Sequence, residues 1–217
     1  MKTSVPPISL AGSELGEVRH VCALFNSDDE EYRVLLPFIK EGFECGDSAI
    51  HVVNPDQRVD HLRRLSAVGI DTAAAQHRGQ FDLRTSTETY LRDGRFDQDR
   101  MLEVFEQAAS GHAKGRFPLS RIVCRMDWAA EGRTHLDNLI EFESRVNDVW
   151  RHHDDAVICT YHLAQFSGDT VIDLMRIHPV VIIGGILRQN PFFIPPERFL
   201  PEFRARKGRQ TARRITV

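Results

Sequence analysis

The fold class of this chain is decided by residues His20–Asn54, HVCALFNSDDEEYRVLLPFIKEGFECGDSAIHVVN. An apolar run predicts a strand at His20–Phe25. Apolar positions at helical spacing then predict a helix at Asp29–Gly42, and a second apolar run predicts a strand at Ser48–Asn54. A strand, a tight turn, a helix and a second strand in this order are typical of a nucleotide-binding α/β unit.

The turn after the first strand does not carry the chemistry of a phosphate-binding loop. Such a loop has glycines and a lysine, whereas residues 26–31 read NSDDEE, with four carboxylates. These carboxylates would repel a phosphate. Each of them would stabilise the following helix by roughly 0.3–1 kcal/mol, because it interacts favourably with the positive end of the helix dipole. The sequence therefore predicts the layout of a nucleotide-binding protein without its phosphate chemistry.

Strands and helices alternate along the rest of the chain. This alternation predicts a three-layer α/β fold, with a mostly parallel sheet covered by helices on both faces. The further strands are expected at Gln80–Thr85, Ser120–Trp128, Ala156–His162 and Val180–Leu187. The further helices are expected at Asp56–Val68, Thr87–Gly94 (a single turn), Asp97–Ala109, Leu136–His152 and from Ser167 or Asp169 to Ile177.

Length and composition indicate one globular domain with two tails. The chain has 217 residues, a net charge of −3, 41% hydrophobic and 27% charged residues, which is ordinary for a soluble domain. We expect a flexible leader at 1–17, a single domain at 18–203 and a basic, disordered tail at 204–217. The first residues lack the apolar segment of a signal peptide, and no apolar run is long enough to cross a membrane, so we expect a cytoplasmic protein.

The tail supplies the one feature that could contact nucleic acid. Residues 204–217 hold six basic side chains and no acidic one. A disordered charged tail is the common fate of such a segment. The overall charge gives no field that would attract nucleic acid or a membrane, so any nucleic-acid contact is expected through this tail alone.

Polar residues follow several of the predicted strands, where open parallel sheets bind their ligands. Phe25 and Asn26 end the first strand, Asp127 and Trp128 end the Ser120–Trp128 strand, and Tyr161 ends the Ala156–His162 strand. Aromatic walls with a few amide and carboxylate groups are typical of a small-molecule pocket. Trp128 and Tyr161 could equally be core residues.

Asp127 raises the alternative of an enzyme. It ends an apolar strand, where a nucleotide hydrolase places its magnesium-binding acid, but a turn or helix-cap role is the commoner one for such an aspartate. Without a phosphate loop, we expect no magnesium-dependent catalysis. A nucleophile elbow of the GxSxG type is also absent from the sequence. We therefore assign no catalytic residue and no cofactor.

Histidines and cysteines suggest a metal site, which their spacing does not support. His20 and Cys22 share one face of the first strand, and Cys124, Cys159 and His162 lie on other predicted strands. No CxxC, HxxxH or HExxH pair is present, although structural zinc sites usually contain such local pairs. We expect buried, inert thiols and no bound metal.

Glu143 lies on the predicted helix Leu136–His152, which is the most clearly amphipathic helix of the sequence. Glu143 and Asn147 are four residues apart and therefore share a helix face. Phe142 beside Glu143 suggests partial burial, and the alternative is a solvated face. His178, before Pro179, is expected to end a helix and to interact with its dipole.

Several short motifs between His20 and about Leu200 resemble the MEDS family, the methanogen/methylotroph, dichloromethane-regulator sensory domain. They are HVCALFNSDDE, PFIKEGFECGDSAIHVV, YLRDGRFDQDRM, RMDWAAEG, EFESRVN, CTYHLAQFSG, MRIHP and NPFF. The resemblance implies a RecA-like or circadian-clock-ATPase-like core that has lost its phosphate loop. The family positions in this chain are His20, Glu31, Asp127, Trp128, Glu143, Tyr161 and His178.

The resemblance also implies a sensory role. We expect a non-enzymatic domain that binds a small organic molecule in signal transduction or transcription regulation, and that acts on a signalling protein. The residues expected to bind the ligand are His20, Phe25, Asn26, Glu31, Asp127, Trp128, Glu143, Tyr161 and His178. Two alternatives stay open: a divergent nucleotide-binding ATPase, and a protein-interaction module acting on a kinase or sigma-factor switch.

Overall fold

The computed structural model describes residues 7–113 and 116–215 and has a seven-stranded sheet at its centre. The strand order is β5-β4-β6-β7-β3-β8-β9; every neighbouring pair is parallel except β8 and β9. The strands are β3 (His20–Phe25), β4 (Ser48–Val53), β5 (Phe81–Thr85), β6 (Ser120–Arg125), β7 (Ala156–His162), β8 (Val180–Ile183) and β9 (Ile186–Gln189).

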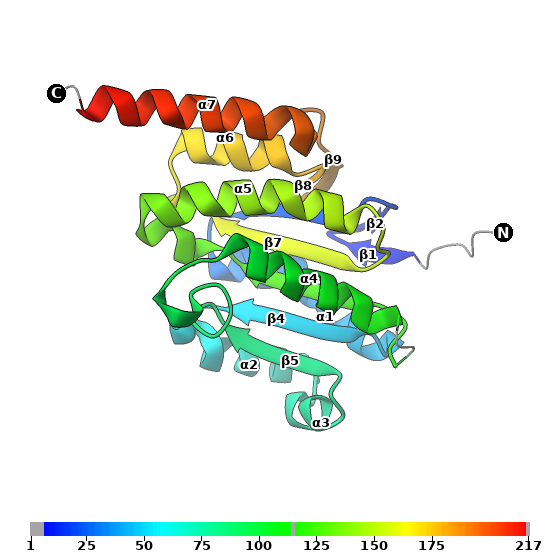
Figure 1. Cartoon of the computed structure of the whole chain (residues 1–217). Helices are drawn as coiled ribbons and strands as arrows, with labels where there is room; N and C mark the ends of the chain where they lie inside the picture. The colour runs from blue at the N-terminus through cyan, green and yellow to red at the C-terminus, as the bar shows by residue number, and fades with distance from the viewer. Residues whose placement is uncertain (1–6, 114–115, 216–217) are drawn as a thin grey trace.

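Helices cover both faces of this sheet, so the expected three-layer α/β fold is confirmed (Figure 1). One face carries α1 (Asp28–Cys45), α2 (Arg58–Ala67) and α3 (Thr72–His77). The other carries α4 (Gln98–Ala113), α5 (Arg133–Trp150), α6 (Gly168–Ile177) and α7 (Pro196–Ile215). Short 3₁₀ turns follow four elements: η1 (Pro55–Gln57), η2 (Arg92–Gly94), η3 (Asp127–Glu131) and η4 (Leu163–Gln165).

Alternation along β3 explains why the sheet separates two apolar cores. Cys22 and Leu24 pack into the core under α4–α7, whereas Val21, Ala23 and Phe25 pack into the core under α1–α3. All six residues of β3 are buried, as expected for a central strand that helices cover on both faces. Among the helices of the described residues, none is long and apolar enough to cross a membrane.

The N-terminal segment differs from the flexible leader that we expected. From Ile8 onward it forms a hairpin of β1 (Ile8–Leu10) and β2 (Ser13–Leu15), turning at Ala11 and Gly12 with positive φ. Ile8, Leu10 and Leu15 are buried in the core under α1. Alternating apolar residues around a glycine turn provide the reason, since they give the segment one apolar face to bury. Residues 1–6 of the expected leader lie outside the described residues.

The C-terminal segment is also more ordered than the disordered tail that the sequence predicts. Helix α7 continues to Ile215, where a disordered tail was expected from 204 onward, and the last two residues of that tail lie outside the described residues. Arg204 pairs with Glu141, Arg206 with Asp173, and Lys207 with Asp137. Acidic residues on α5 and α6 therefore neutralise three of the basic side chains, which a count of charges along the sequence does not reveal.

The last predicted strand, Val180–Leu187, is in fact a hairpin. Gly184 and Gly185 form a two-residue turn with φ of 58° and 74°, and β9 returns antiparallel to β8. Two consecutive residues with positive φ suit glycine and define a tight hairpin turn. The chain thus ends its sheet with an antiparallel edge strand.

Candidate functional site

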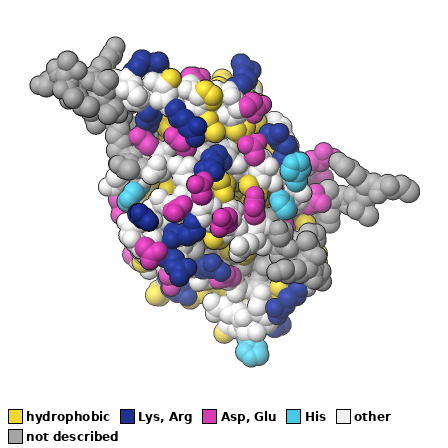
Figure 2. Space-filling model, in the orientation of Figure 1, with side chains coloured by type: hydrophobic (Ala, Val, Ile, Leu, Met, Phe, Trp, Pro, Cys, Tyr) yellow, Lys and Arg dark blue, Asp and Glu magenta, His cyan; other side chains and the backbone are white. Residues whose placement is uncertain are grey.

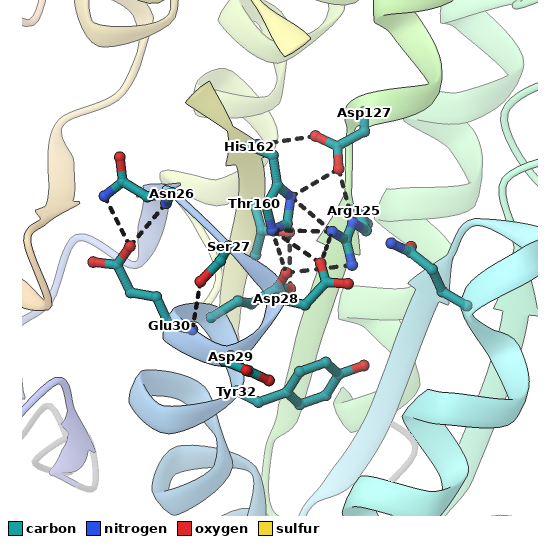
Figure 3. Close-up of polar contacts among 12 residues, drawn as sticks. Asn26, Ser27, Asp28, Asp29, Glu30, Tyr32, Arg125, Asp127, Thr160 and His162 are labelled. Atoms are coloured by element: carbon teal, nitrogen blue, oxygen red, sulfur yellow. Dashed lines mark hydrogen bonds and ion pairs between the residues drawn. The ribbon is translucent and has the colours of Figure 1, made fainter. Parts of the chain in front are cut away.

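The N-terminus of α1 is closed by its own side chains. Ser27 is the N-cap, and its Oγ accepts a hydrogen bond from the backbone N–H of Glu30 at 3.3 Å. The Glu30 carboxylate accepts bonds from the backbone N–H of Asn26 at 2.8 Å and from its side-chain amide at 2.9 Å (Figure 3). These bonds from Asn26 lower the pKa of Glu30. The helix end that binds an anion in related folds is therefore already occupied here.

Arg125 lies at the centre of a group of three carboxylates. It comes from the end of β6, and its guanidinium contacts Asp28 and Glu31 of α1 and Asp127 of η3. The Nε–Oδ2 distance to Asp127 is 2.8 Å, and the Nη1–Oε2 distance to Glu31 is 3.5 Å. Figure 3 shows Asp28 and Asp127 converging on Arg125 from α1 and η3.

His162 joins the same group from the end of β7. The Asp127 carboxylate accepts hydrogen bonds from the backbone N–H of His162 at 2.9 Å and from its Nδ1 at 2.8 Å. Burial alone would raise the pKa of Asp127, but the bonds from His162 and Arg125 outweigh it and lower that pKa. Burial alone would lower the pKa of His162, but the hydrogen bond to Asp127 outweighs burial, so the pKa of His162 is raised. Asp127 and His162 therefore favour their charged forms together.

Glu31 is the least well compensated member. Its Oε1 accepts a hydrogen bond from the Thr160 hydroxyl at 3.1 Å, and burial raises its pKa despite the nearby Arg125. Asp28, Glu31 and His162 present donor atoms close enough to hold a metal ion. However, the Arg125 guanidinium already contacts all three residues, so these donors have a cation from the protein itself.

A cleft of about 650 Å³ opens beside this ion-pair group. Its walls come from residues that follow five parallel strands, where ligands bind in open α/β sheets. Most of the lining residues are polar: Asn26, Ser27, Asp28, Asn54, Asp56, Gln57, Ser86, Thr87, Arg125, Asp127, Glu131, His162 and Gln165. A second cavity, of about 510 Å³, lies between α5, α6 and α7 and adjoins the cleft, since Ala130 and Gln165 line both.

Trp128 contributes the aromatic part of the cleft wall. Its ring stacks on Tyr90 at a centroid distance of 4.9 Å, and only 2% of the residue is exposed. The indole N–H finds no acceptor among the residues that the structure describes. A buried donor without an acceptor costs about 1–3 kcal/mol.

The residues that we expected to bind a ligand do not form one site. Asn26, Glu31, Asp127 and Trp128 meet at the strand ends. Phe25 and Tyr161 are fully buried in the two cores on opposite faces of the sheet. Tyr161 pairs with Leu24, and the side chain of Phe25 points to the face opposite that of Leu24 because side chains alternate along a strand. They cannot form the expected shared aromatic wall.

His20, Glu143 and His178 form a separate cluster inside the protein. His20 begins β3, Glu143 lies on α5, and His178 follows α6; each is at most 1% exposed. The Nε2 atoms of both histidines lie within 3.1 Å of Glu143 Oε2. Burial would raise the pKa of Glu143, but its close contacts with His178 and His20 lower it to about 2. The interpretation of Glu143 as a solvated residue is therefore wrong. It is buried, but its carboxylate contacts the two histidines, whereas the Asn147 amide donates to its backbone carbonyl.

Four residues of these two sites escaped the sequence analysis or received no role there: Asp28, Arg125, Cys159 and His162. Arg125 and Asp127 are two residues apart at a strand end, which was the available signal. The sequence places Cys159 and His162 on a predicted strand, but no neighbouring residue indicates that Cys159 faces α5 and that His162 faces α1. The four cysteines are free, and Cys22, Cys124 and Cys159 are buried as expected.

Comparison with known proteins identifies the family and the fold of this chain. The sequence of residues 19–179 matches the family described as MEDS, the methanogen/methylotroph, DcmR sensory domain. A curated relative is the transcriptional repressor DcmR of Methylorubrum extorquens, with 24% identity over 174 residues, which cover 78% of this chain and 61% of the relative. This chain thus spans about three fifths of that protein's length.

Among solved structures, the flagellar accessory protein FlaH of Methanocaldococcus jannaschii superposes with a TM-score of 0.50 at 10% identity. The match covers 78% of this chain and 76% of FlaH, and it shows a shared RecA-like fold. The family match extends over most of the chain and includes the acidic turn, Arg125, Asp127 and His162. The chain belongs to the MEDS family of sensory domains.

Proposed function

We propose that this domain is a non-enzymatic sensor, which binds a small organic molecule in the strand-end cleft and acts on a regulatory partner protein. One observation carries the proposal. The place where a related fold would hold phosphate is closed by the ion pairs of Arg125 with Asp28, Glu31 and Asp127, while the adjoining cleft stays open.

The lining of the cleft supports a small molecule of mixed polarity. Its volume of about 650 Å³ lies within the usual range for ligand pockets, about 300–1,000 Å³. Amides and hydroxyls such as Asn26, Ser86 and Thr87 offer hydrogen bonds, and Trp128 offers an aromatic edge with an unsatisfied N–H. A short organic molecule with one acceptor group fits this set better than a triphosphate, which the acidic turn would repel.

Ligand binding is tested by a thermal-shift screen of short alcohols, amides and halogenated hydrocarbons, followed by calorimetry on any hit. A true ligand raises the melting temperature in a saturable way that follows mass action. Trp128→Phe keeps the ring but removes the N–H, so it should weaken binding by about tenfold, which corresponds to one hydrogen bond of roughly 1.4 kcal/mol.

Trp150→Phe is the matched control for this variant. Trp150 is also buried, but it lies on α5 and its N–H donates to the Asp155 carbonyl at 2.9 Å. This variant should lose stability and keep its ligand affinity. If no compound shifts the melting temperature of the well-folded protein, or if both variants bind equally well, the cleft is not a sensory site.

Nucleotide binding is the rival function, and the same sample tests it. Asp127 already accepts three hydrogen bonds from Arg125 and His162, so it has little capacity left for a magnesium ion. We expect no micromolar binding of Mg-ATP. Such binding, lost in Asp127→Asn, would replace the sensor by an ATPase-like function.

The output of the sensor is proposed to be control of transcription through a partner. The relative's name, transcriptional repressor DcmR, supports this assignment. On the face seen in Figure 2, acidic and basic side chains are interspersed, without a large field of either sign. A protein partner suits such a surface better than nucleic acid, which favours a basic patch. Affinity capture with and without the identified ligand should recover this partner in a ligand-dependent way.

A further inference from the structure

Four potential metal ligands converge inside the core, away from the strand-end cleft. They are His20 on β3, Glu143 on α5, Cys159 on β7 and His178 after α6. Their donor atoms all lie within 4.8 Å of one another, and each residue is at most 1% exposed.

The distances between these donor atoms are close to the edges of one small tetrahedron. Glu143 Oε2 lies 3.0 Å from His20 Nε2 and 3.1 Å from His178 Nε2. Cys159 Sγ lies 3.5 Å from Glu143 Oε1 and 3.8 Å from His20 Nε2. Zinc bonds of about 2.0–2.1 Å to nitrogen or oxygen and about 2.3 Å to sulfur give tetrahedral edges of roughly 3.3–3.6 Å. The Sγ contact is with the second oxygen of Glu143, and the remaining donor pairs lie within 4.8 Å of one another, so the side chains would have to draw together to reach that geometry.

The hydrogen bonds around the cluster fix which ring nitrogen of each histidine carries hydrogen. His178 Nδ1 lies 2.8 Å from the Leu174 carbonyl, which can only accept, so Nδ1 is the donor. His20 Nδ1 lies 2.9 Å from Asn147 Oδ1. The Asn147 amide nitrogen donates to the Ile177 carbonyl at 2.7 Å and to the Ser144 carbonyl at 3.0 Å, so its oxygen is the acceptor and His20 Nδ1 is also a donor.

This arrangement leaves two lone pairs facing one carboxylate. A neutral imidazole has one N–H, so both Nε2 atoms are acceptors and point at Glu143 Oε2, which is also an acceptor. One added proton satisfies one of the two contacts and leaves the other repulsive. Two added protons satisfy both, but they leave a net positive charge in a site without solvent, which is costly.

We propose that His20, Glu143, Cys159 and His178 together bind one divalent transition-metal ion of the zinc class. Two neutral imidazoles, a carboxylate and a thiolate cancel the charge of such an ion and give every donor a partner. Metal-bound histidines commonly donate their other N–H to a carbonyl oxygen, as both histidines do here. With four protein ligands and no solvent access, the site is closed and structural.

The proposal departs from the sequence expectation of no metal for a clear reason. The ligands come from four elements spread between positions 20 and 178, so no local spacing reveals them. The ion would join α5 and the end of α6 to the centre of the sheet. It shares no ligand with the strand-end cleft, so its failure would leave the proposed sensory function untouched.

Metal content and a cobalt spectrum test the site in the untagged 217-residue chain. The Cys45→Ser background removes the exposed thiol. After expression with added zinc and gel filtration, mass spectrometry of the metal should find close to one equivalent per chain. Replacement of zinc by cobalt should give the intense visible bands of tetrahedral Co²⁺ and a near-ultraviolet thiolate-to-cobalt band.

Cys159→Ser should abolish the thiolate band and reduce metal retention at least tenfold. Cys124→Ser is the matched control, because Cys124 is equally buried on the neighbouring strand β6 and lies outside the cluster. It should retain the metal and the band. If Cys159→Ser does not fold, the cobalt spectrum of the Cys45→Ser protein alone tests whether the bound metal is tetrahedral and has a thiolate ligand.

Three outcomes would overturn the proposal. Metal far below one equivalent after zinc-supplemented growth would mean that the cluster holds protons only. A cobalt spectrum typical of octahedral, weakly bound ions would place the metal on the surface. A thiolate band that survives Cys159→Ser, or disappears in Cys124→Ser, would assign the sulfur ligand to another residue.

Discussion

Replacing Arg125 with methionine is the sharpest perturbation of the strand-end site. The Arg125 side chain is 6% exposed, and it contacts Glu31 and Asp127, whose side chains are 8% and 10% exposed. Methionine retains most of the apolar stem and removes the charge. Removal of one partner from a buried ion pair costs about 3–5 kcal/mol, because the remaining charge is left uncompensated. Asp28 is 45% exposed and should add little.

Urea unfolding measures this loss directly. With a denaturant dependence of about 2.5 kcal/mol per molar, a loss of about 3–5 kcal/mol lowers the midpoint by roughly 1–2 M at pH 7. Arg151→Met is the control, since Arg151 and Asp148 form an ion pair in which both side chains are 58% exposed. That variant should lose less than about 1 kcal/mol.

The pH dependence separates a charge effect from a packing effect. In Arg125→Met the carboxylates of Glu31 and Asp127 lose their cation, so their pKa values rise and protonation relieves the strain. The stability gap between variant and wild type should therefore narrow from pH 7 to pH 5. Adding Glu31→Gln to Arg125→Met should recover part of the loss at pH 7. A gap below 1 kcal/mol, or one that stays constant with pH, would refute the electrostatic reasoning.

Three further perturbations test other parts of the structure. Burial lowers the pKa of His61 to about 4 in the folded protein. As the pH falls below about 6.5, His61 therefore becomes protonated in the unfolded chain but stays neutral in the folded chain. The free energy of unfolding should therefore fall by up to about 3 kcal/mol between pH 6.5 and 4, and His61→Gln should remove this component. Ser27→Ala removes the N-cap of α1 and should cost about 1 kcal/mol in urea unfolding; an unchanged midpoint would contradict the cap. Gly184→Val should cost about 1–2 kcal/mol because Gly184 has φ of 58°, whereas Gly184→Asn should be nearly neutral; equal losses would contradict the turn assignment.

Much of the fold could be predicted because local patterns encode it. The strands at His20–Phe25 and Ala156–His162 have the bounds that the apolar runs predict. Helix α1 begins one residue before the prediction, at Asp28, and ends three residues after it, at Cys45. In these segments periodicity, capping residues and glycine punctuation all favour the same element.

The misplaced elements have physical explanations in the sequence as well. The run Val180–Leu187 predicts one strand, because apolar residues continue on both sides of Gly184 and Gly185. The pair of glycines is nevertheless the local signal of a hairpin. The N-terminal hairpin was missed because its two strands have three residues each, too few for periodicity to distinguish them from a loop.

The candidate sites show the limit of local patterns most clearly. The acidic turn, read from residues 26–31 alone, correctly indicated a helix end without phosphate chemistry. The identity of its partners could not be read in the same way, because Arg125 and His162 arrive from strands about 100 and 130 residues further along the chain. Charge along the sequence gives the sign of a site but not which opposite charges reach it.

The layered α/β class, the family and the loss of a phosphate loop can be predicted from local segments, because each depends on residues close together in the chain. Two features follow only from the folded chain: Arg125 neutralises the acidic turn, and His20, Glu143, Cys159 and His178 meet in one buried cluster. Both outcomes depend on the strand order β6-β7-β3 and on the packing of α5 against this sheet. Strand order and helix packing are set by the burial of the whole apolar surface, a property that no short segment contains.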